Sequence, residues 1–305
     1  NDYLTKPVSK DELIARIKTH VQLSKINLAY SRFVPQEFLQ FLQKESIVDV
    51  HLGDQVEKSM SVVFADILDF TSLSEQMTPE ENFCFINAFL SRMEPAIANH
   101  HGFIDKYIGD AIMALFSGHG DRSSADDALQ AALAMLERLR QYNQHRTAEG
   151  LSPIQLGIGI NTGSMMLGTV GGKNRMDGTV ISDTVNVAAR IERMTRQFNV
   201  NLLISDQTFF QLQDANRYAM RVIDRVQAKG KQKFISVYEV FDADAPEQRA
   251  KKLITKTDFE NALLSYYRRD YATALSGFQL CLAKHPEDVV AQIYLEKCRQ
   301  FCLGG

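Results

Sequence analysis

The apolar and polar positions along the chain divide its middle part into alternating strands and helices. Short apolar runs bounded by polar residues predict buried strands, whereas apolar residues that recur every three or four positions predict helices. Strands are predicted at 60–66, 103–108, 111–116 and 154–161, and helices at about 78–98 and 124–146. The second helix has a clear start, because Ser123 and Ser124 are followed by Asp126 and Asp127 three positions later. This order predicts a βαββαβ unit of the α+β class, one sheet with helices on one face.

The flanking segments indicate one large domain between two linkers. Further short strands near 201–204, 218–223 and 234–240 extend the sheet, so that residues 57–241 form one α+β domain. Residues 31–56 are predicted to be a linker with one short helix after Pro35, and residues 242–256 have the composition of a second linker.

Three helices are predicted in the last part of the chain, residues 257–305. Apolar residues recur there at spacings of three and four, at Leu264, Tyr267, Tyr271, Leu275, Phe278 and Leu282. The segment resembles a tetratricopeptide helix pair with one extra helix, over "YYRRDYATALSGFQLCLAKHPEDVVAQIYLEKC". Because a single such unit cannot bury its own apolar face, we expect it to pack on the main domain or on a second chain.

Residues 1–30 resemble the last strand and helix of a response-regulator receiver domain, over "DYLTKPVSKDELIARI". Lys6 matches the lysine of the Lys-Pro pair that ends the final strand in that family, and Ser9 with Glu12 forms a capping box. The resemblance implies a two-component input from a receiver domain and its sensor kinase. Since the sequence begins at Asn1 without a Met, we expect upstream domains. The alternative is an ordinary helix after a turn.

Composition narrows the class of protein. Of 305 residues, 45% are hydrophobic and 23% charged, which is typical of a globular protein. The net charge is -3 and no basic block is present, so a nucleic acid or a membrane surface is not an expected partner. Neither a signal peptide nor an apolar run of about 20 residues occurs. The four cysteines fit no zinc spacing and are expected to be reduced, so we predict a cytoplasmic protein.

Two aspartates follow apolar strands and are candidates for metal binding. Asp66 ends the run Ser61-Val62-Val63-Phe64-Ala65, where a carboxylate costs free energy unless a partner compensates it. Asp110 follows Gly109 in a predicted hairpin turn. If the strand and the hairpin are neighbours, the two carboxylates converge, and a hard divalent cation removes their repulsion. Alternatively, Asp66 caps the following helix and Asp110 only serves the turn.

Two further segments carry groups that suit a nucleoside triphosphate. After Asp66 the chain enters a helical turn, where the backbone N–H groups of Phe70 and Thr71 favour phosphate oxygens. In "RMDGTVISDTVNVAARIERM", Ser182 or Asp183 can cap a helix on which Asn186 and Arg190 share one face. Such a pair can hold a ribose or phosphate oxygen and stabilise charge at phosphorus. Alone, it is more typical of a solvated helix face.

Together these pieces resemble the class III nucleotidyl cyclases, through "FADILDFT", "DKYIGDAIMALF" and "DGTVISDTVNVAARIE" in the order of that family. The resemblance covers most of residues 57–241 and implies the ferredoxin-like cyclase catalytic domain. It implies that Asp66, Asp110 and the carbonyl of Ile67 bind two divalent ions, Mg²⁺ or Mn²⁺. One ion would activate the ribose 3′-hydroxyl and the other would bind the triphosphate.

The resemblance also assigns the remaining substrate contacts. It implies that Asn186 orients the ribose, that Arg190 steadies the transition state, and that Lys229 in "QAKGKQKF" contacts the terminal phosphate. In this family the active sites lie between two chains, with metal aspartates from one and the Asn-Arg pair from the other. We therefore expect a homodimer with two sites and an inactive monomer.

The choice of base rests on two positions. Lys106 is predicted to lie between Ile104 and Ile108 on one apolar face, where an ammonium group needs an acceptor. The family's adenine-specific members pair such a lysine with an Asp or Thr seven residues before the Asn, here Thr179. A lysine can donate to adenine N1, and a hydroxyl can accept from the 6-amino group.

The sequence therefore predicts an adenylate cyclase that converts ATP to 3′,5′-cyclic AMP and pyrophosphate. One alternative is a guanylate cyclase, because the hydroxyl of Thr179 can also donate. Another is an inactive cyclase-like module that senses ATP or mediates dimerisation. A diguanylate cyclase is not favoured, since its Gly-Gly-Asp/Glu-Glu-Phe signature is absent from the hairpin. Asp69 stands where the family often has Gly and adds a carboxylate near the phosphate loop.

Overall fold

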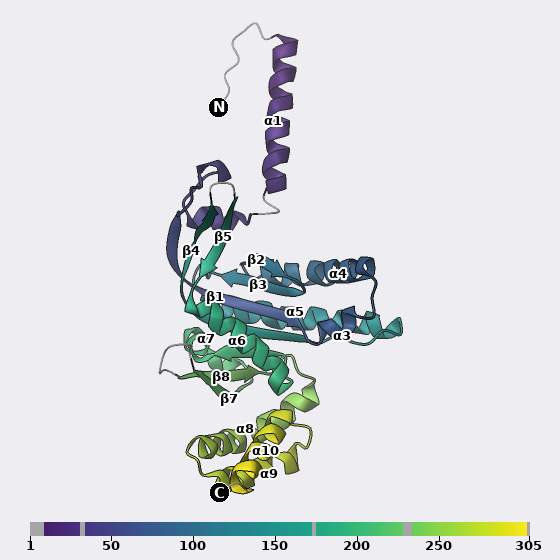
Figure 1. Ribbon diagram of the computed structural model, residues 1–305, viewed down its shortest axis with the longest axis vertical. Helices are drawn as coiled ribbons and strands as arrows, with labels where there is room; N and C mark the ends of the chain where they lie inside the picture. The colour runs from purple at the N-terminus through teal and green to yellow at the C-terminus, as the bar shows by residue number, and fades with distance from the viewer. Residues whose placement is uncertain (1–8, 31–33, 173–174, 228–233, 304–305) are drawn as a thin grey trace. The chain divides into compact units, whose positions relative to one another are not determined.

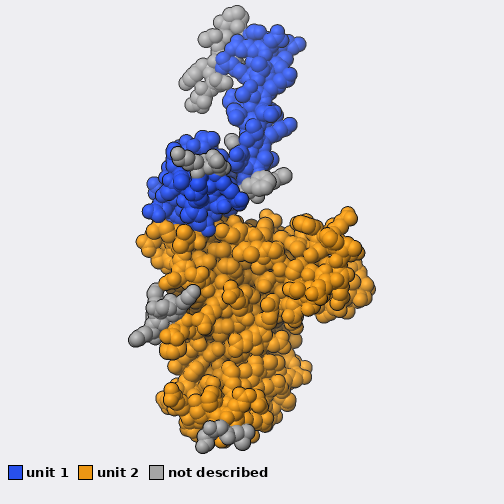
Figure 2. Space-filling view, viewed as in Figure 1, with its two compact units in different colours: residues 1–56, 167–179 blue, residues 57–166, 180–305 orange. Residues whose placement is uncertain are grey.

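The computed structural model describes the residues 9–30, 34–172, 175–227 and 234–303. The chain divides into two compact units, residues 1–56 with 167–179 and residues 57–166 with 180–305, which Figure 2 shows in different colours. Each unit is described by itself below. Among the helices of the described residues, none combines the length and the hydrophobicity that crossing a bilayer requires.

The smaller unit holds three short or isolated helices and the outer part of a hairpin. Its helices are α1 (Lys10–Tyr30), α2 (Gln36–Phe41) and a 3₁₀ turn (Ile47–Asp49). The predicted short helix after Pro35 is confirmed as α2. Phe38 of α2 is buried, and its ring lies against Gly178, where a Cβ atom would be 2.9 Å from the ring. Helix α1 leaves its apolar residues exposed, and Lys6 lies outside the described residues, so the receiver likeness stays a prediction.

The main sheet has eight strands in the order β2-β3-β1-β4-β6-β8-β7, with β5 paired to β4 (Figure 1). The strands are β1 (Gln55–Ile67), β2 (Gly102–Ile108), β3 (Ala111–Phe116), β4 (Leu156–Gly172), β5 (Arg175–Ile181), β6 (Leu202–Ser205), β7 (Met220–Gln227) and β8 (Phe234–Val240). The predicted strand positions are confirmed, although β4 runs 11 residues beyond its predicted end at 161. Strand β5 was not predicted. The predicted hairpin is the antiparallel pair β2–β3.

Helices α4 (Pro79–Ala98) and α5 (Ser124–Ala148) cover one face of the sheet, as predicted. Thr78 caps α4 by accepting from the N–H of Glu81, and Ser123 caps α5 by accepting from the N–H of Asp126. The core on this face takes alternate residues of the central strands: Val63, Ala65, Ile67, Ile112, Ala114 and Phe116. Because successive side chains of a strand point to opposite faces, Asp66 lies on the other face.

Helix α6 (Asp183–Phe198) packs on that other face, unusually close to β4. Gly157, Gly159 and Gly163 line its contact with the strand. A Cβ atom on Gly159 would lie 2.6 Å from the Cα atom of Glu192 and 2.7 Å from the carbonyl oxygen of Ala188. The absence of a side chain at Gly159 therefore sets how deeply α6 sits on the sheet.

The remaining short helices of this unit are α3 (Phe70–Ser74), α7 (Asp206–Gln211) and a 3₁₀ turn (Ala215–Arg217). The C-terminal segment forms α8 (Pro246–Tyr267), α9 (Tyr271–Lys284) and α10 (Val289–Leu303). Three helices were predicted here, but residues 246–256, expected in a linker, belong to α8. Pro246 stands at the first turn of the helix, where its missing N–H costs nothing.

The C-terminal helices pack on the sheet and on α6 of the same chain, one of the two expected arrangements. Phe278 and Tyr294 are buried in a second core together with Phe198 of α6. The guanidinium of Arg221 on β7 is fully buried, 2.7 Å from Glu239 of β8 and 2.5 Å from Asp288 before α10. Removing one partner of a buried ion pair lowers the stability of a protein by several kcal/mol. The contact of Arg221 with Asp288 therefore holds the C-terminal helices on the sheet.

We expect Gly159→Ala to destabilise the protein by about 2 kcal/mol, because the new methyl group forces α6 away from β4. Chemical denaturation followed by circular dichroism measures this change. Gly172→Ala is the matched control, since a Cβ atom at Gly172 meets nothing within 4 Å. Equal stability of the two variants would show that α6 can move outward without cost.

Candidate active site

The two predicted carboxylates lie together at one end of the central strands. Strand β1 pairs with β3 so that Ala65 faces Ile112, which brings Asp66 beside Asp110. Gly109 forms the hairpin turn with a φ of 66°. Burial, together with hydrogen bonding to and repulsion from Asp66, raises the pKa of Asp110 to about 7. The Oδ2 atom of Asp110 is buried and has no hydrogen-bond partner of good geometry within the described structure.

This donor set suits a hard divalent cation. Within the described residues, no group of three or more His, Cys, Asp or Glu side chains is placed to hold a metal. A Mg²⁺ ion is commonly held by one or two carboxylates and completes its shell with water and substrate phosphates. The buried, unpartnered oxygen of Asp110 and the adjacent Asp66 fit that pattern, with backbone at Ile67 next to them. Asp66 does not cap α3, because Asp69 occupies the cap position.

Two residues of α6 that were not singled out in the sequence lie next to the carboxylates. Arg196 places Nη2 3.7 Å from Oδ2 of Asp66. Glu192 is 8% exposed, and burial and the charge of Asp66 raise its pKa to about 7. Their spacing of four residues predicts that Glu192 and Arg196 share one face of a helix. The sequence does not show which strand that face contacts.

Asn186 and Arg190 are on α6 as predicted, but the chain does not bring Arg190 to its own carboxylate pair. Ser182 caps the helix by accepting from the N–H of Thr184. Asn186 and Arg190 lie about 120° around the helix axis from Glu192 and Arg196. The guanidinium of Arg190 donates to the carbonyl of Gln227 at the end of β7, at 2.7 Å. Strand β7 is four strand spacings from β1, roughly 19 Å.

The position of Lys106 differs from the prediction in one respect. The pairing of β2 with β3 shifts between Ile104 and Lys106, so Ile104 faces Ala114 and Lys106 faces Met113. Ile104 therefore packs with the core under α4 and α5, and Lys106 lies on the opposite face, which is the face of Asp66. The extra residue at this shift is Asp105. A β-bulge cannot be read from alternation, which explains why the sequence placed Ile104 and Lys106 on one face.

The remaining predicted residues are less completely described. Thr179 is half-buried in β5, in the other compact unit, and Lys229 lies outside the described residues. Helix α3 begins at Phe70, which is half-buried and whose ring stacks on that of Phe85 with the ring centres 6.1 Å apart. Asp69 has a φ of 57°, a conformation that favours Gly and that Asp tolerates. Thr71 is exposed.

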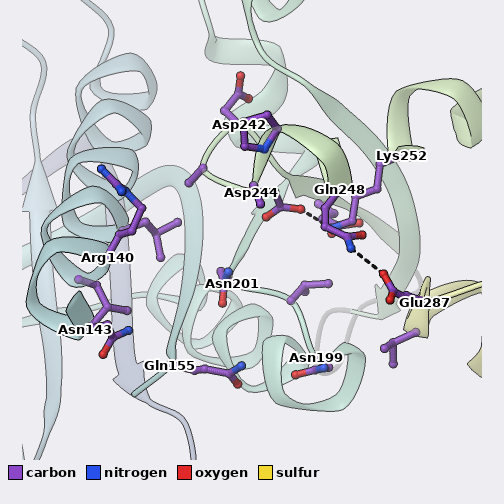
Figure 3. Close-up of a pocket in the computed structure, with 18 of the residues that line it drawn as sticks. Arg140, Asn143, Gln155, Asn199, Asn201, Asp242, Asp244, Gln248, Lys252 and Glu287 are labelled. Atoms are coloured by element: carbon purple, nitrogen blue, oxygen red, sulfur yellow. Dashed lines mark hydrogen bonds and ion pairs between the residues drawn. The ribbon is translucent and has the colours of Figure 1, made fainter. Parts of the chain in front are cut away.

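A cavity of about 1200 Å³ lies elsewhere, between the end of α5 and the C-terminal helices (Figure 3). Its charged groups pair largely with one another. Lys252 bonds to Asp244 at 2.5 Å, and Gln248 donates to Glu287 at 2.6 Å. None of the predicted site residues lines this cavity. Cavity size alone would therefore point away from the carboxylate pair.

The comparisons with known proteins show which family the catalytic domain belongs to. The family model described as adenylate and guanylate cyclase catalytic domain matches residues 53–240. An adenylate cyclase of Anabaena cylindrica is 42% identical over 224 residues, 72% of this chain and 44% of that protein. The chain spans less than half the length of the curated relatives that head this comparison.

Two solved structures share the fold and differ in the base that their names state. The adenylyl cyclase CyaB from P. aeruginosa is 30% identical with a TM-score of 0.54, covering 62% of this chain and 96% of its own. The guanylyl cyclase Cya2 is 32% identical with a TM-score of 0.52, covering 64% and 97%. The match of the family model over more than half of the chain decides the family, and this chain belongs to the adenylate and guanylate cyclase catalytic domain family.

Proposed function

We propose that the protein is an adenylate cyclase that converts ATP to 3′,5′-cyclic AMP and pyrophosphate. The observation that carries the proposal is the Asp66–Asp110 pair, which combines mutual repulsion with a buried, unpartnered oxygen. The repulsion between the two carboxylates lowers stability, and divalent cations bound with a triphosphate would offset it.

The carboxylates of Asp66 and Asp110, with the carbonyl of Ile67, would hold two divalent ions, Mg²⁺ or Mn²⁺. Bound there, the ions would lower the pKa of the ribose 3′-hydroxyl and neutralise charge on the triphosphate. The Nη2 atom of Arg196 lies 3.7 Å from Oδ2 of Asp66. The backbone N–H groups of Phe70 and Thr71 would receive phosphate oxygens, and Lys229 would contact the terminal phosphate.

Catalysis would need two copies of the chain. In this chain the guanidinium of Arg190 donates to the carbonyl of Gln227 on β7, which is separated from β1 by three strands, and not to the carboxylate pair. In a head-to-tail homodimer, Asn186 and Arg190 of the second copy would face the first copy's Asp66 and Asp110. Asn186 would orient the ribose, and Arg190 would stabilise charge gathering at phosphorus.

ATP is the proposed substrate because Lys106 lies on the sheet face of Asp66 and carries a donor for adenine N1. The hydroxyl of Thr179 would accept from the 6-amino group. A guanylate cyclase is the second candidate, since this hydroxyl can donate instead and the similar structure Cya2 is named a guanylyl cyclase. An inactive sensing module is less favoured, because Asp66, Asp110, Asn186 and Arg190 are all present.

The receiver likeness leads to a proposal on regulation. Phosphorylation of an upstream receiver would repack α1 and α2 and so change how two catalytic domains meet. Attaching a complete receiver domain and comparing cyclase rates with and without its phosphorylation tests this. Equal rates would count against it.

The first prediction concerns activity. The purified chain should form cyclic AMP from ATP with Mg²⁺ or Mn²⁺, and form less product from GTP. In Asp110→Ala the rate should fall by about 100-fold or more, because a ligand of the reacting centre is lost. Chromatographic detection of both cyclic nucleotides measures the result. A dimer silent with both nucleotides and both metals would favour the sensing module, and preferred use of GTP would favour the guanylate cyclase.

The second prediction concerns the two-chain site. Asp110→Ala and Arg190→Ala should each be inactive alone, yet regain about a quarter of wild-type activity when mixed, because random pairing makes half of the dimers mixed, each with one intact site. Asp110→Ala mixed with Asp66→Ala is the control and should stay inactive, since both changes lie in the same half. If the first mixture stays as inactive as the control although subunits exchange, the shared site is contradicted.

The third prediction separates stability from activity. Asp110→Asn should stabilise the metal-free protein by about 1 kcal/mol at pH 8, after allowance for the half-exposed position of the group. The folded-state pKa is about 7, against an ordinary value of 3.8 for an aspartate, so the folded protein takes up a proton as the pH falls. Wild-type stability should therefore rise from pH 8 towards pH 4, and the advantage of Asp110→Asn should shrink over this range.

Thermal unfolding at several pH values, with and without Mg²⁺, checks this third prediction. Mg²⁺ should raise the melting temperature of the wild type and leave that of Asp110→Asn unchanged. Asp11→Asn, on the exposed first turn of α1, is the matched control and should behave as the wild type does. A lower stability of Asp110→Asn at pH 8 would refute the repulsion on which the site is built.

A further inference from the structure

The β-bulge in β2 brings two oppositely charged neighbours together on one strand. In a regular strand, successive side chains point to opposite faces. Here the pairing with β3 skips Asp105, because Ile104 faces Ala114 and Lys106 faces Met113. As a result the Nζ atom of Lys106 lies 3.3 Å from Oδ2 of Asp105. Bulges are frequent next to active sites, where they redirect a side chain.

Asp105 is placed where a carboxylate is costly. Its side chain is only 5% exposed, and Oδ2 has no hydrogen bond of good geometry within the described structure. Burial raises the pKa of Asp105, and the charge of Lys106 opposes that rise. The lysine side chain is 39% exposed, and an ammonium group has three hydrogens, so a contact with Asp105 uses only part of its donor capacity.

We propose that Asp105 is a positioning residue that aims the ammonium group of Lys106 at the purine ring and so contributes to the choice of adenine. The inference rests on the proposed function and deepens it. A lysine has four rotatable bonds in its stem, and an anchored ammonium group loses less freedom when a base binds. The anchored, charged group donates to adenine N1 and is opposed by the N1–H donor of guanine.

The test compares Asp105→Asn with the wild type for ATP and GTP. The amide keeps the shape of the side chain and removes the charge that anchors Lys106. We expect kcat/KM for ATP to fall about tenfold, mainly through KM, and the value for GTP to change little. Asp258→Asn is the matched control, because Asp258 also pairs with a lysine, Lys284 at 2.8 Å, in the C-terminal helices. It should keep the wild-type ratio of ATP to GTP.

A double-mutant cycle separates positioning from a general structural effect. If Asp105 acts through Lys106, Asp105→Asn should not change the ratio further when Lys106→Met is already present. Lys106→Met alone should lower the melting temperature, since it leaves Asp105 buried without its cation, and the double variant should recover part of this loss. An equal effect of Asp105→Asn in both backgrounds, or an unchanged ratio, would overturn the inference.

Binding measurements test the role of Asp105 separately from the cyclase activity. The 3′-deoxy forms of ATP and GTP lack the attacking hydroxyl, so calorimetry with them reports base preference without turnover. A tenfold loss of preference in Asp105→Asn would support the inference even in a chain that makes no cyclic nucleotide, where only the proposed function fails. If Asp105→Asn does not fold, Asp105→Glu replaces it. Because the charge is retained, this variant should keep the preference within about threefold, and a tenfold loss would argue against anchoring by charge.

Discussion

The depth at which α6 sits on β4 is the constraint on which the arrangement of the site depends. Gly159 lets the backbone of the helix approach the strand where any side chain would collide with Glu192 and Ala188. At this depth one side of α6 brings Arg196 to Asp66, and another brings Arg190 to the end of β7. A single helix thus contacts two places on the sheet, and the proposed two-chain site rests on this arrangement.

Two groups of buried charge differ in what lies beside them. Arg221 is fully buried but sits between Glu239 and Asp288, and the three groups tie the C-terminal helices to the sheet. Asp110, by contrast, lies beside the like charge of Asp66, and its Oδ2 atom has no hydrogen-bond partner within the described residues. Since unpaired buried charge costs free energy, the first group is structural and the second indicates a ligand.

The β2–β3 hairpin shows how a local irregularity sets which face of the sheet a side chain lies on. Gly109 closes the turn and brings Asp110 beside Asp66, and the bulge at Asp105 moves Lys106 to the same face as Asp66. Without the bulge, Lys106 would point into the core under α4 and α5. The metal-holding and base-recognising ends of the proposed site therefore depend on one hairpin of about fifteen residues.

The sequence by itself determined seven of the eight strands, the helices on the sheet and the two carboxylates, because these follow from local periodicity and residue type; β5 and the full length of β4 were not predicted. The sequence also placed Asn186 and Arg190 on one face of a helix, and the family resemblance alone gave them a role. Only the tertiary structure decided that Glu192 and Arg196 meet Asp66, that Asp105 bulges, and that Pro246 begins a helix packed on the sheet. These features depend on strand register and on contacts between residues far apart in the chain, and local sequence patterns carry no information on either.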